Sequence, residues 1–428
     1  MKLFHFVGLG TILLASALSA CSDKEDVIIE PTTPDPDPEP SYNVINLSQE
    51  GMANCYIVTE PGIYKFKADN QFNLGPGLPV PPTISPAGAD LIWQTEKGSI
   101  TAVTLDSENE SFPYIVFNVE KAEGNALISA IDEKGKILWS WHIWMPAEEI
   151  QGIKLVTGYE VMNMNLGALN NTPGDATSYG MLYQWGRKDP FPAAASLTGD
   201  TSTQSAPIYD IMGKKVAIAN SSWDNLDANT LEYSIANPTV CLSNYAQFSS
   251  SRDWLRADLS DDSLWGNPEG DYREEDSNLY RNKGKKTCYD PSPLGWRVPP
   301  VDVFRNFTAS GGYAWNFEDF NIADINNDGI VNLDDYNYGW FFNTNDEGSL
   351  YFPAAARFDG SYAMLMGSVS GIWGNYWSNS PYMGIKGGGF SALSFQIKDM
   401  YGNEQISISP SAGSSKADAF SIRCIRDN

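Results

Sequence analysis

The chain has 428 residues, with 53 acidic against 28 basic side chains and a formal net charge of −25. A surface this acidic repels nucleic acid and anionic headgroups, which excludes both as partners and favours cations, calcium in particular. The chain has only two histidines. Because His5 lies in an N-terminal segment that we expect to be removed, metal or catalytic sites that need two or three imidazoles are excluded. The length predicts two domains after the N-terminal segments.

The first 20 residues are expected to be a lipoprotein signal peptide. Lys2 precedes an uncharged, mainly apolar run at residues 6–17, which is too short to span a bilayer as a helix. The ending Leu-Ser-Ala-Cys at residues 18–21 resembles a bacterial lipobox, whose cysteine is acylated, for example with palmitate. We therefore expect Cys21 to anchor the chain in the outer membrane through lipid. The alternative is an ordinary cleaved signal with an incidental cysteine.

Residues 21–41 are predicted to be an acidic, proline-rich linker. The acidic cluster at residues 22–26 is similar to the surface-export tag of Bacteroidetes lipoproteins, which favours the cell surface over a plain solvated linker. Residues 31–41 alternate proline with acidic residues. That pattern predicts an extended, self-repelling spacer.

Residues 42–148 are predicted to form a β-sandwich domain, because short apolar runs alternate with turn residues. Residues 63–68, for example, alternate with period two, as in a strand. The strand expected at residues 137–144 holds three tryptophans. Two are expected to cover the core and a third to pack at the domain junction, which we favour over sugar stacking. His142, on the same strand, is expected to be structural.

Residues 153–428 are rich in Gly, Trp, Tyr and Asn, so loops and short strands are expected to dominate. A helix is predicted after Pro299 and Pro300, because Val301, Phe304 and Phe307 recur at helical spacing.

This second part of the chain resembles one known family. The motifs that carry the likeness are MNLGA at 164–168, YGMLYQWGRKDPF at 179–191, GWRVPP at 295–300, YFPAAAR at 351–357, WSNS at 377–380 and SIRC at 421–424. In this order they resemble the Fibrobacter succinogenes major paralogous domain, common in Bacteroidetes lipoproteins and related to the C-type-lectin-like fold. The resemblance covers most of residues 153–428. It implies a mainly β, α+β chain in which a β-sandwich is followed by a C-type-lectin-like domain.

The resemblance also implies a disulfide. The family usually has Cys-Pro just before Gly-Trp, and that cysteine is expected to bridge to one near the C-terminus. This chain has Ser292 and Pro293 there and carries Cys288 four residues earlier. We therefore expect Cys288 to pair with Cys424. Cys55 and Cys241 are then free, or paired with each other across the domains.

The aromatic residues beside Gly371 and Gly374 have two interpretations. Trp373, Tyr376 and Trp377 suit packing in a loop-rich fold, which we favour, and they are also the candidates for ligand contact. The Glu-Pro-Asn and Gln-Pro-Asp triplets of sugar-binding C-type lectins are absent from the sequence. The calcium-mediated sugar site of those lectins is therefore not expected.

Residues 324–335 form the sharpest chemical motif, a predicted calcium loop inserted in the second domain. Oxygen donors stand at loop positions 1, 3, 5, 7, 9 and 12, and Gly329 stands at position 6, where the chain must turn sharply. These donors are Asp324, Asn326, Asp328, the Ile330 carbonyl, Asn332 and Asp335. Val331, at position 8, is expected to hold the loop against its surroundings. The loop is similar to those of dockerins, but we find no second copy. The alternative is a hydrophilic turn without metal, and any bound calcium is expected to be structural.

The sequence thus favours a non-catalytic surface lipoprotein that adheres to a glycan or protein ligand. One alternative is a surface hydrolase with paired carboxylates, since acidic residues are abundant but no spacing singles out a pair. Another is a cohesin-type assembly partner, suggested by the dockerin-like loop and disfavoured by the lack of a second loop.

Overall fold

The computed structural model describes residues 43–107, 112–266, 284–345, 348–382 and 388–427. Asn43–Asn428 forms one compact unit, separate from the first 42 residues. The predicted signal peptide, Cys21 and the linker lie outside the described residues. Within these residues, no helix combines the length and the apolar character needed to cross a membrane.

The described chain is mainly β, as the sequence predicted. Its first strands are β1 Ile45–Asn46, β2 Cys55–Ile57, β3 Gly62–Lys67, β4 Gly88–Gln94, β5 Ile100–Asp106, β6 Tyr114–Val119, β7 Gly124–Ile131, β8 Ile137–Met145, β9 Gly152–Lys154, β10 Glu160–Met162, β11 Met181–Gln184, β12 Phe191–Pro192, β13 Ile208–Tyr209, β14 Lys215–Val216, β15 Ala219–Asn220 and β16 Val240–Cys241. The later strands are β17 Trp296–Arg297, β18 Gly339–Asn343, β19 Ser349–Pro353, β20 Phe358–Asp359, β21 Met364–Leu365, β22 Trp373–Tyr382, β23 Gly388–Lys398, β24 Glu404–Ser409, β25 Ala412–Ser415, β26 Ala419–Phe420 and β27 Ile425–Arg426.

Helices are short in the part of the chain that is described. The α-helix is α1 Leu231–Ala236, and the 3₁₀-helices are η1 Ala176–Ser178, η2 Tyr245–Gln247, η3 Arg305–Phe307, η4 Phe317–Asp319, η5 Leu333–Asp335 and η6 Gly367–Val369. The helix α1 begins where the Thr230 hydroxyl accepts a hydrogen bond from the Tyr233 N–H at 3.1 Å, which satisfies one of the free donors of its first turn.

The helix predicted after Pro300 is wrong. Backbone N–H groups there donate to carbonyls three residues earlier, as Arg305 does to Asp302 at 3.1 Å, rather than four residues earlier as in an α-helix. Only the short 3₁₀-helix η3 forms. The apolar spacing arises from aromatic packing instead of a helix face, since the Phe307 ring stacks on Phe342 with centroids 3.9 Å apart. Phe304 and Phe307 thus enter the core from turns rather than from a helix face.

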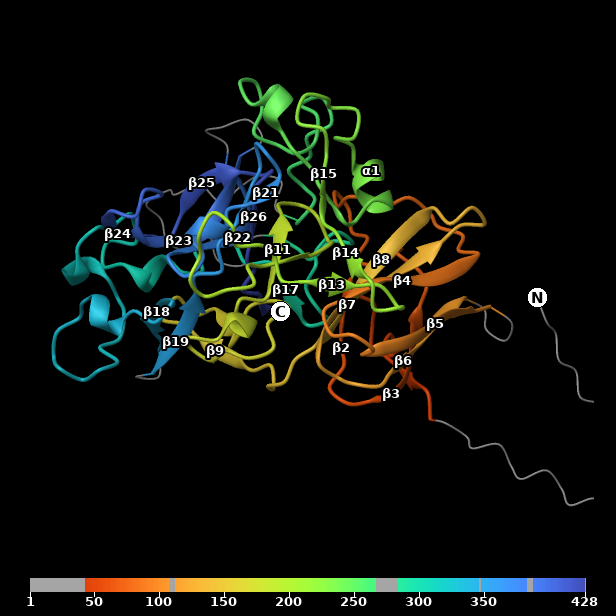
Figure 1. The fold of residues 1–428 in the computed structure, drawn as a ribbon, viewed down its shortest axis with the longest axis horizontal. Coiled ribbons are helices and arrows are strands. Elements are labelled where there is room, and N and C mark those ends of the chain that lie inside the picture. The colour runs from red at the N-terminus through yellow and green to blue at the C-terminus, as the bar shows by residue number, and fades with distance from the viewer. Residues whose placement is uncertain (1–42, 108–111, 267–283, 346–347, 383–387, 428) are drawn as a thin grey trace, which may run out of the picture. The chain divides into compact units, whose positions relative to one another are not determined.

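Two sheets are built mainly from the strands β1 to β8 (Figure 1). One has the strand order β1-β3-β6-β5 and the other β14-β13-β4-β7-β8-β2. Alternate side chains of β3 are buried, as expected for a strand with one face on a core. The Phe66 ring of the first sheet meets the Trp141 ring of the second at 5.2 Å. The facing surfaces of the two sheets therefore share an aromatic core.

The second sheet is buried on both faces, and the later part of the chain packs against it. Every residue of β8 from Trp139 to Met145 is buried, although its side chains alternate between faces. The Trp144 indole donates to the Ala168 carbonyl at 2.7 Å. This contact lies where the sequence predicted a tryptophan at the junction. Strand β13, from the later part of the chain, also pairs with β4.

Asn54 joins the two parts through two of its three hydrogen bonds. Its amide nitrogen donates to the carbonyls of Cys288 and Asp290, at 2.7 and 2.9 Å, and its oxygen accepts from the Trp139 indole at 3.0 Å. One hydrophobic cluster runs from Cys55 to Cys424. Residues on both sides of the predicted domain boundary therefore share one core.

Candidate functional site

The predicted calcium loop closes on itself through its first and last carboxylates. Asp324 accepts hydrogen bonds from the N–H groups of Asp328 and Gly329, at 3.3 and 2.8 Å. Asp335 accepts from those of Ile325 and Asn332, at 2.9 and 3.0 Å. The first and last residues of the loop thus both accept hydrogen bonds from backbone N–H groups within it.

The other predicted ligands of this loop lie close to one another. The Asn326 amide donates to the Asp328 carboxylate at 3.2 Å, and the Asn332 amide donates to the Ile330 carbonyl at 3.3 Å. Gly329 has φ +85° and open space where a Cβ would stand. This left-handed conformation is what the sequence assigned to loop position 6.

Apolar contacts hold the loop against the protein. Val331, at loop position 8, and Leu333 pack on the second hydrophobic cluster, whereas Ile330 is exposed. Among the described residues, no group of three or more His, Cys, Asp or Glu side chains is placed to hold a metal ion. A calcium site here would also use two amide oxygens and one carbonyl oxygen.

The predicted disulfide is not formed in this structure. Cys288 and Cys424 are both free and buried, as are Cys55 and Cys241. The two thiols have different partners: Cys288 donates to the Pro79 carbonyl at 3.4 Å, and Cys424 donates to the Ser292 hydroxyl at 3.2 Å. Burial raises the pKa of the Cys424 thiol to about 12, which keeps it protonated.

Two of the three predicted ligand-contact aromatics belong to the core. Tyr376 and Trp377 are fully buried, and their polar atoms donate to the carbonyls of Pro353 and Tyr183, both at 2.7 Å. Trp377 also stacks on Phe420, with centroids 4.2 Å apart. Neither ring reaches solvent, so neither can contact a ligand at the surface. Trp373 is half-buried.

A different set of aromatic side chains lies exposed on the surface. Trp223, Tyr245 and Tyr362 are 53%, 43% and 56% exposed. The rings of Trp223 and Tyr245 lie 4.8 Å apart, and those of Tyr245 and Tyr362 lie 5.7 Å apart. We call these three rings, together with exposed Phe248 on the same loop as Tyr245, the aromatic surface.

Hydrogen bonds between three loops fix the aromatic surface. The Asn244 N–H donates to the Gly360 carbonyl at 2.9 Å, which ties the Tyr245 loop to the Tyr362 loop. The Ser243 N–H donates to the Ser221 hydroxyl at 2.8 Å, which ties it to the Trp223 loop. The rings are therefore held in place before any ligand arrives.

Sequence reasoning missed the aromatic surface because its rings come from loops up to 139 positions apart. One local signal was present: Trp223 stands in the run Ser-Ser-Trp-Asp-Asn, where no apolar period accounts for a large ring. An isolated tryptophan in a polar turn has no core to enter and therefore indicates an exposed contact.

No family model matches this chain, and no curated protein or solved structure is significantly similar to it.

Proposed function

We propose that this chain is a non-catalytic cell-surface lipoprotein that binds a neutral glycan through the aromatic surface. The observation that carries the proposal is the contact of three exposed rings from three separate loops. A monomeric surface rarely gathers exposed large apolar rings without a partner. Tyrosine and tryptophan are also the side chains that dominate binding sites, because they offer rigid apolar area with a polar edge.

Polar groups beside the rings favour a sugar over an apolar partner. The Ser222 hydroxyl contacts the Asp224 carboxylate next to Trp223, and the Asp227 N–H is held by Asn225 at 2.9 Å. The exposed side chains of this loop present oxygen acceptors to sugar hydroxyls, while the rings cover the apolar C–H face of a pyranose. The net charge of −25 disfavours sulfated or sialylated glycans.

Calcium is proposed as a structural ion of the loop Asp324–Asp335. The donor set fits a hard cation, since it has three carboxylates, two amides and one carbonyl in a loop closed by Asp324 and Asp335. Because Val331 and Leu333 pack on the core, ordering the loop also orders part of that cluster. Calcium would thus stabilise the distal part of the protein and take no part in chemistry.

The membrane anchor and the family assignment are parts of the same proposal. Cys21 would carry the lipid that holds the chain in the outer membrane, and residues 21–41 would hold the binding part away from it. Residues 42–148 are proposed as a β-sandwich, supported by the two sheets with a common core. Residues 153–428 are proposed as a C-type-lectin-like domain of the Fibrobacter succinogenes major paralogous type.

The state of His142 supports a non-catalytic role. The imidazole is buried, with Nε2 2.8 Å from the Asn125 amide oxygen and Nδ1 3.4 Å from the Tyr183 hydroxyl. Burial lowers its pKa to about 3. A buried imidazole that already has two partners cannot act as a general base for an external substrate.

A glycan array with single-ring variants tests this function. Binding of the purified protein to neutral glycans is expected to fall at least tenfold in Trp223→Ala and in Tyr245→Ala. Trp315→Ala is the matched control, because Trp315 is 62% exposed and contacts Tyr313 rather than the aromatic surface. Equal loss in the control, binding only to a protein ligand, or turnover of a glycan would reject the proposal.

A further inference from the structure

Three lysines are buried in the described chain, and one differs from the others. The Lys286 ammonium donates to three backbone carbonyls at 2.6–2.8 Å. Lys188 contacts Asp189, its neighbour in sequence, at 2.6 Å. Lys416 contacts the carboxylate of Asp262, which is 154 positions away in the chain. Of these lysines, Lys416 is therefore the one that touches a carboxyl group distant in sequence.

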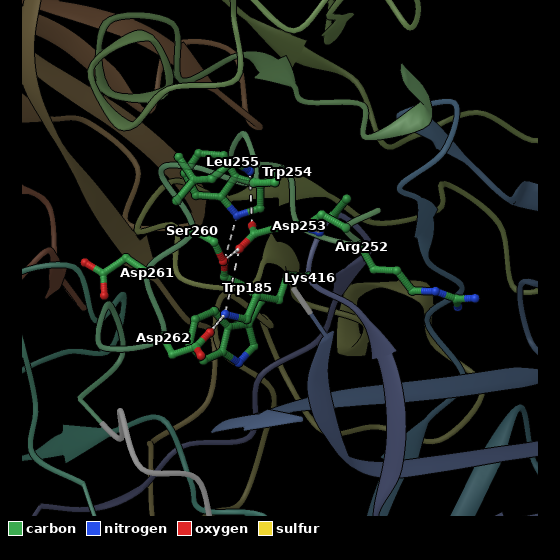
Figure 2. Close-up of polar contacts among 12 residues, drawn as sticks. Trp185, Arg252, Asp253, Trp254, Leu255, Ser260, Asp261, Asp262 and Lys416 are labelled. Atoms are coloured by element: carbon green, nitrogen blue, oxygen red, sulfur yellow. Dashed lines mark hydrogen bonds and ion pairs between the residues drawn. The ribbon is translucent and has the colours of Figure 1, made fainter. Parts of the chain in front are cut away.

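Lys416 lies between two carboxylates and an indole ring (Figure 2). Its Nζ is in direct contact with Asp262 Oδ1 and lies 3.8 Å from Asp253 Oδ2. It also lies 4.0 Å from the centroid of the Trp185 ring. The side chains of Lys416 and Asp253 are both 1% exposed, so these two groups meet without water.

Asp253 is held in position and is able to carry a proton. Its Oδ2 accepts from the Ser260 hydroxyl at 2.7 Å, and its Oδ1 accepts from the Leu255 N–H at 3.1 Å. Burial raises the pKa of this carboxyl group, although Lys416 acts in the opposite direction. Asp262 is 41% exposed, so the reacting pair has one side open to solvent.

Neighbouring backbone and hydroxyl groups fix the segments that carry these side chains. The carbonyl of Arg252 accepts from the Ala417 N–H at 3.3 Å and from the Ser415 hydroxyl at 2.6 Å. The Trp185 N–H donates to the Lys416 carbonyl at 3.1 Å. These bonds fix Lys416 beside Asp253, and the bond from the Ser260 hydroxyl to Asp253 ties the segment of Asp262 to the same place, which replaces a bimolecular encounter by a fixed arrangement.

We propose that Lys416 and Asp262 join in an intramolecular isopeptide bond, with Asp253 as the group that moves the proton. The reaction starts from the unprotonated Lys416 amine and the protonated Asp262 acid, and the burial of Lys416 keeps water away from the attacking nitrogen. Lys416 Nζ attacks Asp262 Cγ and forms the new C–N bond. Asp253 takes a proton from the attacking nitrogen and gives one to the departing hydroxyl.

The reaction is a condensation that needs no further reagent. An amine and a carboxylic acid give one amide and one water, no atom changes oxidation state, and Asp253 ends as it began. The water leaves on the exposed side of Asp262. The bond would close a covalent loop between the segments of Asp262 and Lys416, which non-covalent contacts hold together otherwise.

Peptide mapping of the purified full-length protein tests the bond. After denaturation and trypsin digestion, cleavage behind Lys416 is expected to be blocked. The peptides that contain Asp262 and Lys416 are expected to appear as one branched species, one water lighter than their sum. Recovery of the two peptides unlinked and at full mass from the wild-type protein would overturn the proposal.

Variants test the role of each group. Lys416→Arg keeps the charge and is expected to abolish the branched species, and Asp253→Asn is expected to abolish it while the circular dichroism spectrum stays unchanged. Asp261→Asn is the matched control, since Asp261 binds Ser263 rather than Lys416, and it is expected to keep the link. A branched species that persists in Asp253→Asn would remove Asp253 from the mechanism.

Discussion

The Cys424 thiol donates a hydrogen bond to the Ser292 hydroxyl at 3.2 Å, and both side chains are fully buried. The expected resemblance would put a cysteine at this position, bridged to one near the C-terminus. In this structure a serine hydroxyl meets the Cys424 thiol there. Cys288 lies four positions earlier and contacts Pro79 instead, which is why it does not replace that cysteine.

Ser292→Cys is expected to form a disulfide with Cys424. The two positions are 132 residues apart, and closing a loop of that length stabilises a protein by about 4–5 kcal/mol if the bond forms without strain. Titration under denaturing, non-reducing conditions should find one free thiol fewer than in the wild type, and the melting temperature should fall on reduction. The double variant Ser292→Cys, Cys424→Ser should show neither effect. One free thiol more in the single variant would contradict the prediction.

Calcium is expected to raise the melting temperature of the protein. A ligand that binds only the folded state stabilises it by about 2.7 kcal/mol when the free ligand concentration is a hundred times the dissociation constant. Asp324→Ala and Asp328→Ala should remove most of the gain, because each takes away one loop carboxylate. Asp334→Ala is the control, since Asp334 is exposed and stands at a loop position that supplies no ligand. Identical melting curves with calcium and with chelator would refute the calcium loop.

Acid is expected to destabilise the protein through His142. The folded pKa of about 3 lies below the value of about 6.5 in the unfolded chain, so the unfolded state binds the extra proton first. The stability due to this group is complete above pH 6.5 and is lost as the pH falls toward 3, by roughly 5 kcal/mol. His142→Gln keeps a donor for Asn125 and should flatten this dependence. Denaturant unfolding at several pH values between 7 and 4 gives the free energy of unfolding of both proteins. If it fell equally with pH in the wild type and in His142→Gln, His142 would not be the source of the acid sensitivity.

Trp377→Ala is expected to destabilise the fold by about 3–5 kcal/mol, because it empties a fully buried site stacked on Phe420. The molecules that remain folded should bind ligand as the wild type does. Trp223→Ala should give the opposite pattern, with the melting temperature nearly unchanged and binding lost. Comparing denaturant midpoints and dissociation constants for the two variants separates core from surface. A selective loss of binding in Trp377→Ala would contradict this division.

Local patterns in the sequence predicted some features well. The alternating strands near Ile63 and Phe66, and the loop with Gly329 in a left-handed conformation, depend on interactions within a few residues. The role of Val331 as the residue that holds this loop also follows from its position. These features lie where the sequence placed them because their causes are local.

Features that depend on distant contacts were not predictable in the same way. The spacing of Phe304 and Phe307 suggests a helix, but stacking with Phe342 from a strand decides the outcome. The sequence favoured packing for Trp377, but its partners in the core, such as the Tyr183 carbonyl, come from a distant segment that no local pattern identifies. The aromatic surface needs three loops to meet, which no local pattern encodes.

The hydrogen bonds of Asn54 have a consequence for biogenesis. Synthesis from the N-terminus delivers Asn54 more than 230 residues before the carbonyls of Cys288 and Asp290 that it binds. Until those carbonyls arrive, the early strands lack the groups that cover one of their faces. The nascent chain therefore stays incompletely packed until most of it has been made.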